Sequence, residues 1–372
     1  MRVALHVDQL WFSAPGGIGT YVRELLAALP AEDPSLELVP FRCRSEAATS
    51  SPGGTPQVVE VPGSIRSLYP RWALTGRPPL PDALSSCEIL HATNHAAVPP
   101  AAGGQALVAT VHDLAFERFP HAFPSDWRWL YRVGVRAAIR RAHIVVVPSR
   151  ATADDLEARG ADPAKIRVTP LASSLPEQAQ DVEAVLGRLG IARPYVLCPA
   201  TIEPRKNQVR LIRAYRQVAP DVPHTLVLAG PDGWGVAEVD AEIQRAGPGR
   251  IVRTGPLNLA DLDAVYRGAD LIAYVSLYEG FGLPIVEAMQ RGVACLASTT
   301  PAVAETAGHA ALLVDPEDVA EIADGLARLL GDQTERGALA EEGRARAAGY
   351  SWAATARATL EAYREAAERA RP

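Results

Sequence analysis

Cysteine is scarce in this sequence, and long apolar runs are absent from it. Its 372 residues include four cysteines, none in a C-x-x-C pair: Cys43, Cys87, Cys198 and Cys295. This pattern predicts reduced, buried thiols and speaks against a disulfide framework. No apolar run reaches the roughly 18 residues that a membrane-spanning helix requires, and the first residues lack a signal-peptide pattern. We therefore expect a cytoplasmic protein.

The sequence also has no excess of positive charge, and lysine is scarce in it. The net charge of −6 gives no support for non-specific nucleic-acid binding. Of 37 basic residues, only Lys165 and Lys206 are lysine, so a lysine at a motif position carries extra weight. The rest of the composition, 48% apolar and 22% charged, is that of a globular protein, and the length suits two domains.

Short apolar runs rich in branched residues alternate with amphipathic stretches, which predicts βαβ units and parallel sheets. A polar stretch without periodicity at residues 171–180 separates two such series and is the best domain boundary. The sequence thus predicts two doubly wound α/β domains. The predicted strands are 3–7, 36–41, 58–61, 89–91, 107–111 and 144–147 in the first series, and 195–198, 225–229, 251–253, 271–275, 294–297 and 311–314 in the second.

The stretch "YEGFGLPIVEAM" places Glu279 and Glu287 on either side of a glycine-rich turn after a predicted strand. Pro284 suits the first turn of a helix, whose free N–H groups form an anion site. Glu279 would accept hydrogen bonds from sugar hydroxyls, and Glu287 would accept both hydroxyls of a ribose. The alternative is a solvated Glu279 and a Glu287 that complements the helix dipole.

A second anion site is predicted in "TIEPRKNQ", where Arg205 and Lys206 follow a strand at the start of a helix. Two cations and free amides suit a diphosphate. The turn "SAPGGIGTY", with Gly16 and Gly17, allows close backbone approach to a phosphate or sugar, but its spacing does not match the NAD-binding pattern.

Other polar motifs are weaker. His112 ends a predicted strand, where a ligand would bind, although a lone histidine is more often structural. His91 and His95 lack a third metal ligand in pattern. The motif "DLD" at Asp261 and Asp263 lies in a helical pattern, and we expect it on the surface.

Four arginines repeat at four-residue spacing within "DWRWLYRVGVRAAIRRA", with Trp127, Trp129 and Tyr131 beside them. On a helix this arrangement is an arginine stripe with aromatic flanks. It suits contact with an anionic lipid surface or a pyrophosphate-linked acceptor, and the alternative is a solvated face. The stripe consists of Arg128, Arg132, Arg136 and Arg140.

Taken in order, "PGGIGTYVRELL", "TVHD", "IEPRKN", "LAGPDGWG" and "SLYEGFGLPIVEAMQRGV" resemble glycosyltransferase family 4, whose members are retaining nucleotide-sugar transferases. The "EPRKN" and "GWG" combination most resembles bacterial GDP-mannose-dependent mannosyltransferases. The resemblance implies a GT-B fold, with two facing Rossmann-like domains. It implies an acceptor domain at 1–175, a donor domain at 176–350 and a final helix, 351–372, that packs back on the first domain.

The resemblance also implies the roles of individual residues. Glu279 would contact the donor hexose, Glu287 the ribose, and His112 the transferred sugar. Arg205 and Lys206 would hold the diphosphate, and no metal ion would be required. The other donor-binding positions implied are Gly16, Gly17, Thr201, Leu257, Gly280, Phe281, Gly282 and Leu283. One departure from the family pattern is that Ala200 and Thr201 stand where many members carry an arginine.

These observations together predict a retaining hexosyltransferase that moves mannose from GDP-mannose to a glycan or lipid-linked acceptor in polysaccharide biosynthesis. The alternatives are a UDP- or TDP-sugar donor, a nucleotide-sugar 2-epimerase of the same fold, and a two-domain sugar-binding protein without activity.

Overall fold

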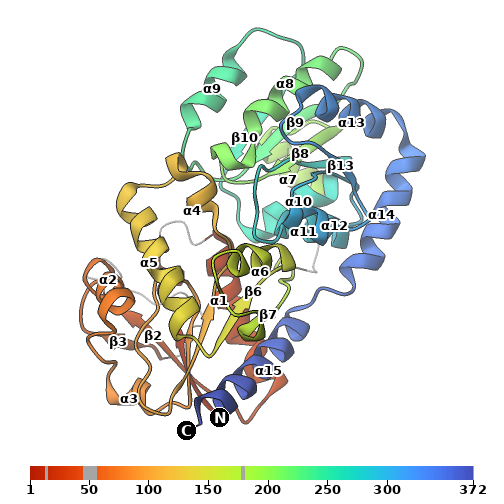
Figure 1. Ribbon diagram of the computed structural model, residues 1–372. Helices are drawn as coiled ribbons and strands as arrows, with labels where there is room; N and C mark the ends of the chain where they lie inside the picture. Colours follow the sequence, from red (N-terminus) through yellow and green to blue (C-terminus); the bar gives the residue numbers. More distant parts are fainter. Residues whose placement is uncertain (13–15, 45–56, 177–180, 372) are drawn as a thin grey trace. The chain divides into compact units, whose positions relative to one another are not determined.

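The computed structural model describes residues 1–12, 16–44, 57–176 and 181–371. The chain forms two compact units, each built on its own parallel sheet (Figure 1). The first unit comprises Met1–Leu171 and Ser351–Pro372, and the second comprises Ala172–Tyr350. The predicted α/β class with two doubly wound parallel sheets is confirmed.

The first unit holds a seven-stranded sheet of order β3-β2-β1-β4-β5-β6-β7. Its central strands are almost wholly buried, because helices cover both faces of the sheet. The strands are β1 Arg2–His6, β2 Glu37–Cys43, β3 Val59–Val61, β4 Ile89–Ala92, β5 Ala106–Thr110, β6 Ile144–Val147 and β7 Ile166–Val168. The helices are η1 Asp8–Trp11, α1 Gly16–Glu32, α2 Ile65–Thr75, α3 Asp82–Ser85, α4 Ala115–Arg118, η2 Pro120–Ala122, α5 Ser125–Arg141, α6 Arg150–Glu157, η3 Pro163–Lys165 and α15 Trp352–Ala370.

The second unit repeats this topology in a six-stranded sheet of order β10-β9-β8-β11-β12-β13. The strands are β8 Tyr195–Pro199, β9 Thr225–Ala229, β10 Ile251–Gly255, β11 Leu271–Tyr274, β12 Cys295–Ser298 and β13 Leu312–Val314. The helices are α7 Val182–Leu189, η4 Pro204–Lys206, α8 Gln208–Val218, α9 Val236–Gln244, α10 Leu259–Gly268, α11 Leu283–Arg291, α12 Pro301–Ala307, α13 Val319–Gly331 and α14 Gln333–Ala347.

The direction of strand addition reverses between β1 and β4 in the first sheet, and between β8 and β11 in the second. In doubly wound sheets the loops at such a switch point diverge, and ligands bind beyond the carboxyl ends of the strands there. The loops after β8 and β11 therefore mark where a ligand of the second unit is expected.

The final helix, α15, belongs to the first unit and packs against α1 and the sheet strand β5 (Figure 1). Ser351 caps its start by accepting a hydrogen bond from the Ala354 amide at 3.1 Å. Inside the unit, the Tyr363 hydroxyl lies 2.7 Å from His91 Nδ1. The last segment of the sequence thus completes the core that the first segment begins.

Each of the twelve predicted strands is present, with ends that differ by at most two residues. The prediction missed β7, a three-residue edge strand in which Arg167 interrupts the apolar run. Its side chain forms an ion pair with Glu365 of α15, Nε to Oε2 at 2.7 Å. The four cysteines are free and buried, as predicted.

Candidate functional site

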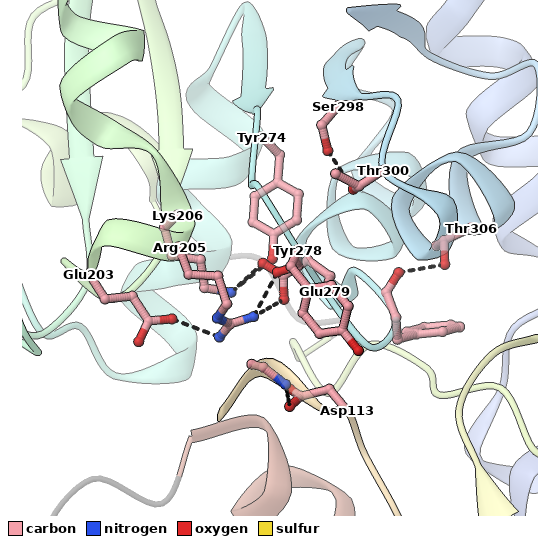
Figure 2. Close-up of polar contacts among 12 residues, drawn as sticks. Asp113, Glu203, Arg205, Lys206, Tyr274, Tyr278, Glu279, Ser298, Thr300 and Thr306 are labelled. Atoms are coloured by element: carbon pink, nitrogen blue, oxygen red, sulfur yellow. Dashed lines mark hydrogen bonds and ion pairs between the residues drawn. The ribbon is translucent and has the colours of Figure 1, made fainter. Parts of the chain in front are cut away.

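Two loops of the second unit bring cations and a carboxylate together at the switch point (Figure 2). The loop after β8 forms the short helix η4, which carries Arg205 and Lys206. The loop after β11 carries Glu279. The two loops are joined through the backbone as well, because the Leu277 amide donates to the Arg205 carbonyl at 2.8 Å.

Glu279 accepts from a different cation on each carboxylate oxygen. Arg205 Nη1 lies 2.7 Å from Glu279 Oε2, and Lys206 Nζ lies 2.6 Å from Glu279 Oε1. Arg205 Nη1 also donates to the Tyr278 carbonyl at 3.0 Å, and Lys206 Nζ lies 3.0 Å from the Tyr274 hydroxyl. One of the two lysines of the chain is therefore held at this cluster.

The cluster is nearly enclosed, and its charges balance. Glu279 is 8% exposed, and Arg205 and Lys206 are 13% and 12% exposed. Glu203 forms a second ion pair with Arg205, Oε1 to Nη2 at 2.7 Å. Burial alone raises the pKa of Glu279, but Arg205 and Lys206 outweigh it and lower the pKa to about 2. Glu279 is therefore an acceptor throughout the physiological pH range, and the alternative of a solvated Glu279 is excluded by its burial.

Asn207 holds η4 against the end of β11, a role that sequence reasoning missed. Its backbone is left-handed, with φ of 63°, and it is the one non-glycine residue with positive φ among those described. Its amide Nδ2 donates to the carbonyls of Val275 at 3.0 Å and Pro316 at 2.7 Å. The asparagine of the "EPRKN" motif thus fixes the position of the two cations before it.

The glycine-rich turn has the geometry expected of a close-approach loop. Gly282 precedes α11 with φ of 111°, a backbone conformation that is strained in any residue with a Cβ atom. Pro284 lies in the first turn of α11, as predicted. The carbonyl of Phe281 accepts from Thr306 Oγ1 at 2.7 Å, which secures the turn to α12. The backbone amides of the turn are therefore held at one end of α11.

Glu287, one turn into α11, is bound by the hydroxyl of Tyr266 at 2.6 Å from its Oε2. Burial raises the pKa of Glu287 above its ordinary value, although Tyr266 and Arg291 act against the shift. The other carboxylate oxygen has no hydrogen-bond partner among the described residues. Glu287 thus retains acceptor capacity, which the predicted ribose role requires.

The expectation that "DLD" lies on the surface is wrong. Asp261 and Asp263 are buried in α10, because arginines from other segments neutralise them. Asp263 Oδ1 accepts from Arg291 Nε at 2.7 Å, and Asp261 Oδ1 accepts from Arg188 Nη2 at 2.6 Å. Both carboxylates therefore serve packing. No group of three metal-ligating side chains occurs among the residues that the structure describes.

His112 belongs to the first unit, at the carboxyl end of β5. Its Nε2 lies 2.9 Å from the Thr93 carbonyl, so this nitrogen carries the proton that it donates. Burial lowers its pKa, and the neutral ring then offers Nδ1 as an acceptor. The arrangement suits a hydrogen bond from a sugar hydroxyl.

The remaining histidines of that region are structural. His91 spans Tyr363 and Thr110, with Nε2 at 2.8 Å from Thr110 Oγ1. His95 is buried against the rings of Phe116 and Tyr131. The pKa of His91 is lowered to about 3 and that of His95 to about 4, both through burial.

The other predicted donor residues lie at the start of α1 and in the loops after β8, β10 and β11. Gly16 and Gly17 are exposed at the start of α1, in the first unit; residues 13–15 of their motif lie outside the described ranges. Thr201 follows β8, and its carbonyl accepts from Gln208 Nε2 at 2.8 Å. Leu257 follows β10 and is half-buried. Gly280 is buried beside Glu279.

The arginine stripe lies on α5, as predicted, but most of the aromatic residues beside it on α5 face the core. Arg132, Arg136 and Arg140 are exposed, and Arg128 is half-buried. Trp127 and Tyr131 pack against the core of the first unit, and only Trp129 is exposed among the three aromatic neighbours. In the described part of the chain, no helix has the length and apolar character to cross a bilayer.

Comparison with known proteins agrees with this architecture. Residues 15–172 match the family described as Glycosyltransferase Family 4, and residues 188–346 match Glycosyl transferases group 1. O-antigen chain mannosyltransferase B of Escherichia coli is 30% identical over 69% of this chain and 70% of its own length. The MMP alpha-(1->4)-mannosyltransferase of Mycolicibacterium hassiacum is 31% identical over 72% of this chain and 67% of its own length. Anabaena Alr3699/HepE, solved in complex with UDP-glucose, superposes with a TM-score of 0.75 at 21% identity, over 97% of this chain and 98% of its own.

The two Rossmann-like units and the return of α15 to the first unit define a GT-B fold. Among proteins of that class, the chain belongs to glycosyltransferase family 4. It is a glycosyltransferase.

Proposed function

We propose that the protein transfers mannose from GDP-mannose to a glycan or lipid-linked acceptor, with retention of configuration at the anomeric carbon. The observation that carries the proposal is the cluster of Arg205, Lys206 and Glu279 at the switch point of the second sheet. Two relatives that cover most of the chain are mannosyltransferases by name, which supports the choice of sugar.

Arg205 and Lys206 supply what the departing diphosphate needs. When the bond between the anomeric carbon and the diphosphate oxygen breaks, negative charge develops on that oxygen. Arg205 and Lys206 are preorganised cations whose side chains are 13% and 12% exposed. In such a buried position they stabilise this charge more strongly than water does. The acceptor oxygen then bonds to the anomeric carbon on the same face, and its proton passes to the diphosphate.

Glu279 positions the sugar in this scheme. Each of its oxygens is bound by a cation, but a carboxylate has about four lone-pair sites and can accept sugar hydroxyls as well. Because its pKa is about 2, it stays ionised and cannot serve as a general acid near neutral pH. We therefore assign it to hexose recognition, with Glu287 on the ribose and His112 on the transferred sugar.

Donor choice has one competing candidate. HepE was solved with UDP-glucose and has the same fold, which supports a UDP-sugar as the alternative donor. A thermal-shift panel with GDP, UDP, TDP and ADP separates the candidates, since a ligand at about 100 times its dissociation constant adds roughly 2.7 kcal/mol. We expect the largest shift with GDP. The largest shift with UDP would replace the donor but keep the family.

Transfer itself is tested with GDP-mannose and a lipid-linked glycan acceptor. The expected product keeps the anomeric configuration of the donor, as read by nuclear magnetic resonance. Formation, without an acceptor, of a product with inverted configuration at C2 would favour the nucleotide-sugar 2-epimerase alternative. We also propose that the enzyme works in the cytoplasm and contacts the membrane through the exposed arginines of α5.

A further inference from the structure

A cavity of about 460 Å³ lies against α5 in the first unit, and none of the residues assigned to the donor lines it. Side chains from α4, from α5 and from the turn after α6 line it. They are Glu117, Arg132, Val135, Arg136, Ile139 and Arg159. Three arginines therefore surround a space that contains one carboxylate.

The carboxylate is already committed to one of the three arginines. Arg159 Nε donates to Glu117 Oε2 at 2.8 Å, and Arg159 Nη2 donates to the same oxygen. Arg159 Nη1 also donates to the Asp155 carbonyl at 2.5 Å. Arg159 and Glu117 thus neutralise each other and form a fixed wall of the cavity.

Arg132 and Arg136 have no such partner. Neither guanidinium forms a hydrogen bond or ion pair with any residue in the described ranges. They lie one turn apart on α5, where like charges repel each other and destabilise the helix. On the neighbouring helix α6, by contrast, Arg150 is paired with both Asp154 and Glu157.

Val135 and Ile139 give the cavity an apolar wall between the charges. Val135 is buried and Ile139 is half-buried against the core of the unit. A ligand that fits this lining carries an anionic group toward the arginines and an apolar portion toward the helix. Planar guanidinium groups bind phosphate oxygens in pairs, which makes phosphate the best match.

We propose that this cavity binds a phosphate group, either on a lipid headgroup or on a soluble phosphate ester. The site is separate from the donor cluster and does not depend on the proposed donor, since its residues all belong to the first unit. The proposal makes the contact suggested above for α5 more specific: the anion would bind in this cavity, to the side chains of Arg132 and Arg136.

The test compares Arg132→Gln/Arg136→Gln with a matched control, Arg66→Gln/Arg71→Gln. Arg66 and Arg71 are exposed arginines of α2 in the same unit, so both variants lose two charges. One arm measures the binding of glycerol 3-phosphate, a soluble phosphate monoester, by calorimetry. The other measures sedimentation with phosphatidylglycerol–phosphatidylcholine vesicles, with pure phosphatidylcholine as the blank.

We expect the cavity variant to bind one of the two probes about tenfold more weakly, or worse, and the control to bind it as the wild type does. Loss confined to vesicles assigns a lipid headgroup, and loss of glycerol 3-phosphate binding assigns a soluble phosphate ester. The variant Arg132→Lys/Arg136→Lys keeps the charge and should restore part of the affinity.

The proposal is overturned if wild-type protein binds neither probe, or if both double variants lose affinity equally. Circular dichroism and the thermal unfolding midpoint of each variant serve as the fold check, because the substitutions lie in the first unit. GDP binding to the wild-type protein tests the donor proposal separately, so the two failures are distinguishable.

Discussion

Lys206 Nζ lies 2.6 Å from Glu279 Oε1, so the cation assigned to the diphosphate is already paired in the free protein. Arg205 is paired with the other oxygen of the same carboxylate. The cluster therefore rests in a neutral state and does not present bare positive charge. A diphosphate that enters must share these cations with Glu279, which favours a ligand that also offers hydroxyl donors to the acid.

Glu279→Ala should abolish transfer while leaving nucleotide binding largely intact, because the acid is assigned to the sugar and the cations to the diphosphate. We expect kcat to fall by about 10²-fold or more, as for the loss of a charged group in a preorganised site. Steady-state kinetics and GDP titration measure the two effects. Glu238→Ala, at an exposed position of α9, is the control. Unchanged turnover would remove Glu279 from the site.

Acidification should lower the free energy of unfolding, partly through protonation of Glu279. Its folded-state pKa of about 2 lies below the ordinary value of 4.5, so it contributes stability that is fully present above the ordinary pKa. That contribution, on the order of 3 kcal/mol, is lost as the pH falls from about 5 toward 2. Chemical denaturation at several pH values should show a shallower decline for Glu279→Gln than for the wild type. Parallel curves would contradict the assignment.

Substitution of Asn207 measures how much its hydrogen bonds, which hold η4 in place, contribute to stability. Asn207→Gly keeps the left-handed backbone but loses all three side-chain hydrogen bonds, including the one that Oδ1 accepts from Arg210 Nη1, and should cost about 2–4 kcal/mol of unfolding free energy. Asn207→Ala loses the same bonds and adds backbone strain of about 1 kcal/mol. Urea denaturation of the two variants measures the difference. Equal stability of the Gly and Ala variants would show that the backbone conformation has relaxed.

Glu287 should determine the preference for a ribose. We expect wild-type protein to bind GDP more tightly than 2′,3′-dideoxy-GDP, and Glu287→Gln to lose most of that preference. Because burial raises the pKa of Glu287, the preference should begin to weaken at a pH above 4.5 on acidification. Competition titrations at pH 7 and pH 5 measure both effects. A preference that survives in Glu287→Gln would assign the ribose to other residues.

Removal of metal ions should leave transfer intact, because Arg205 and Lys206 are assigned the charge that a divalent cation would otherwise supply. The expected result is unchanged kcat after dialysis against EDTA, measured with GDP-mannose at saturation. Full loss that Mg²⁺ or Mn²⁺ restores would show that the donor is bound as a metal complex.

The sequence was sufficient to predict twelve of the described strands and the order of the motifs along the chain. Runs such as 144–147 are buried on both faces in a parallel sheet, so hydrophobic composition identifies them without periodicity. The short strand β7 escaped prediction because Arg167 interrupts its apolar run, and the ion-pair partner of Arg167, Glu365, lies 198 positions away. Local pattern cannot report a contact of that separation.

The sequence by itself determined which residue types stand at the carboxyl ends of strands, including Arg205, Lys206 and Glu279. Only the tertiary structure decided which of them meet. Glu279 pairs with cations more than 70 positions away, and Asp263 is buried because Arg291 neutralises it. The physical reason is that a charge enters the interior only with its partner, and strand order, not sequence distance, selects that partner.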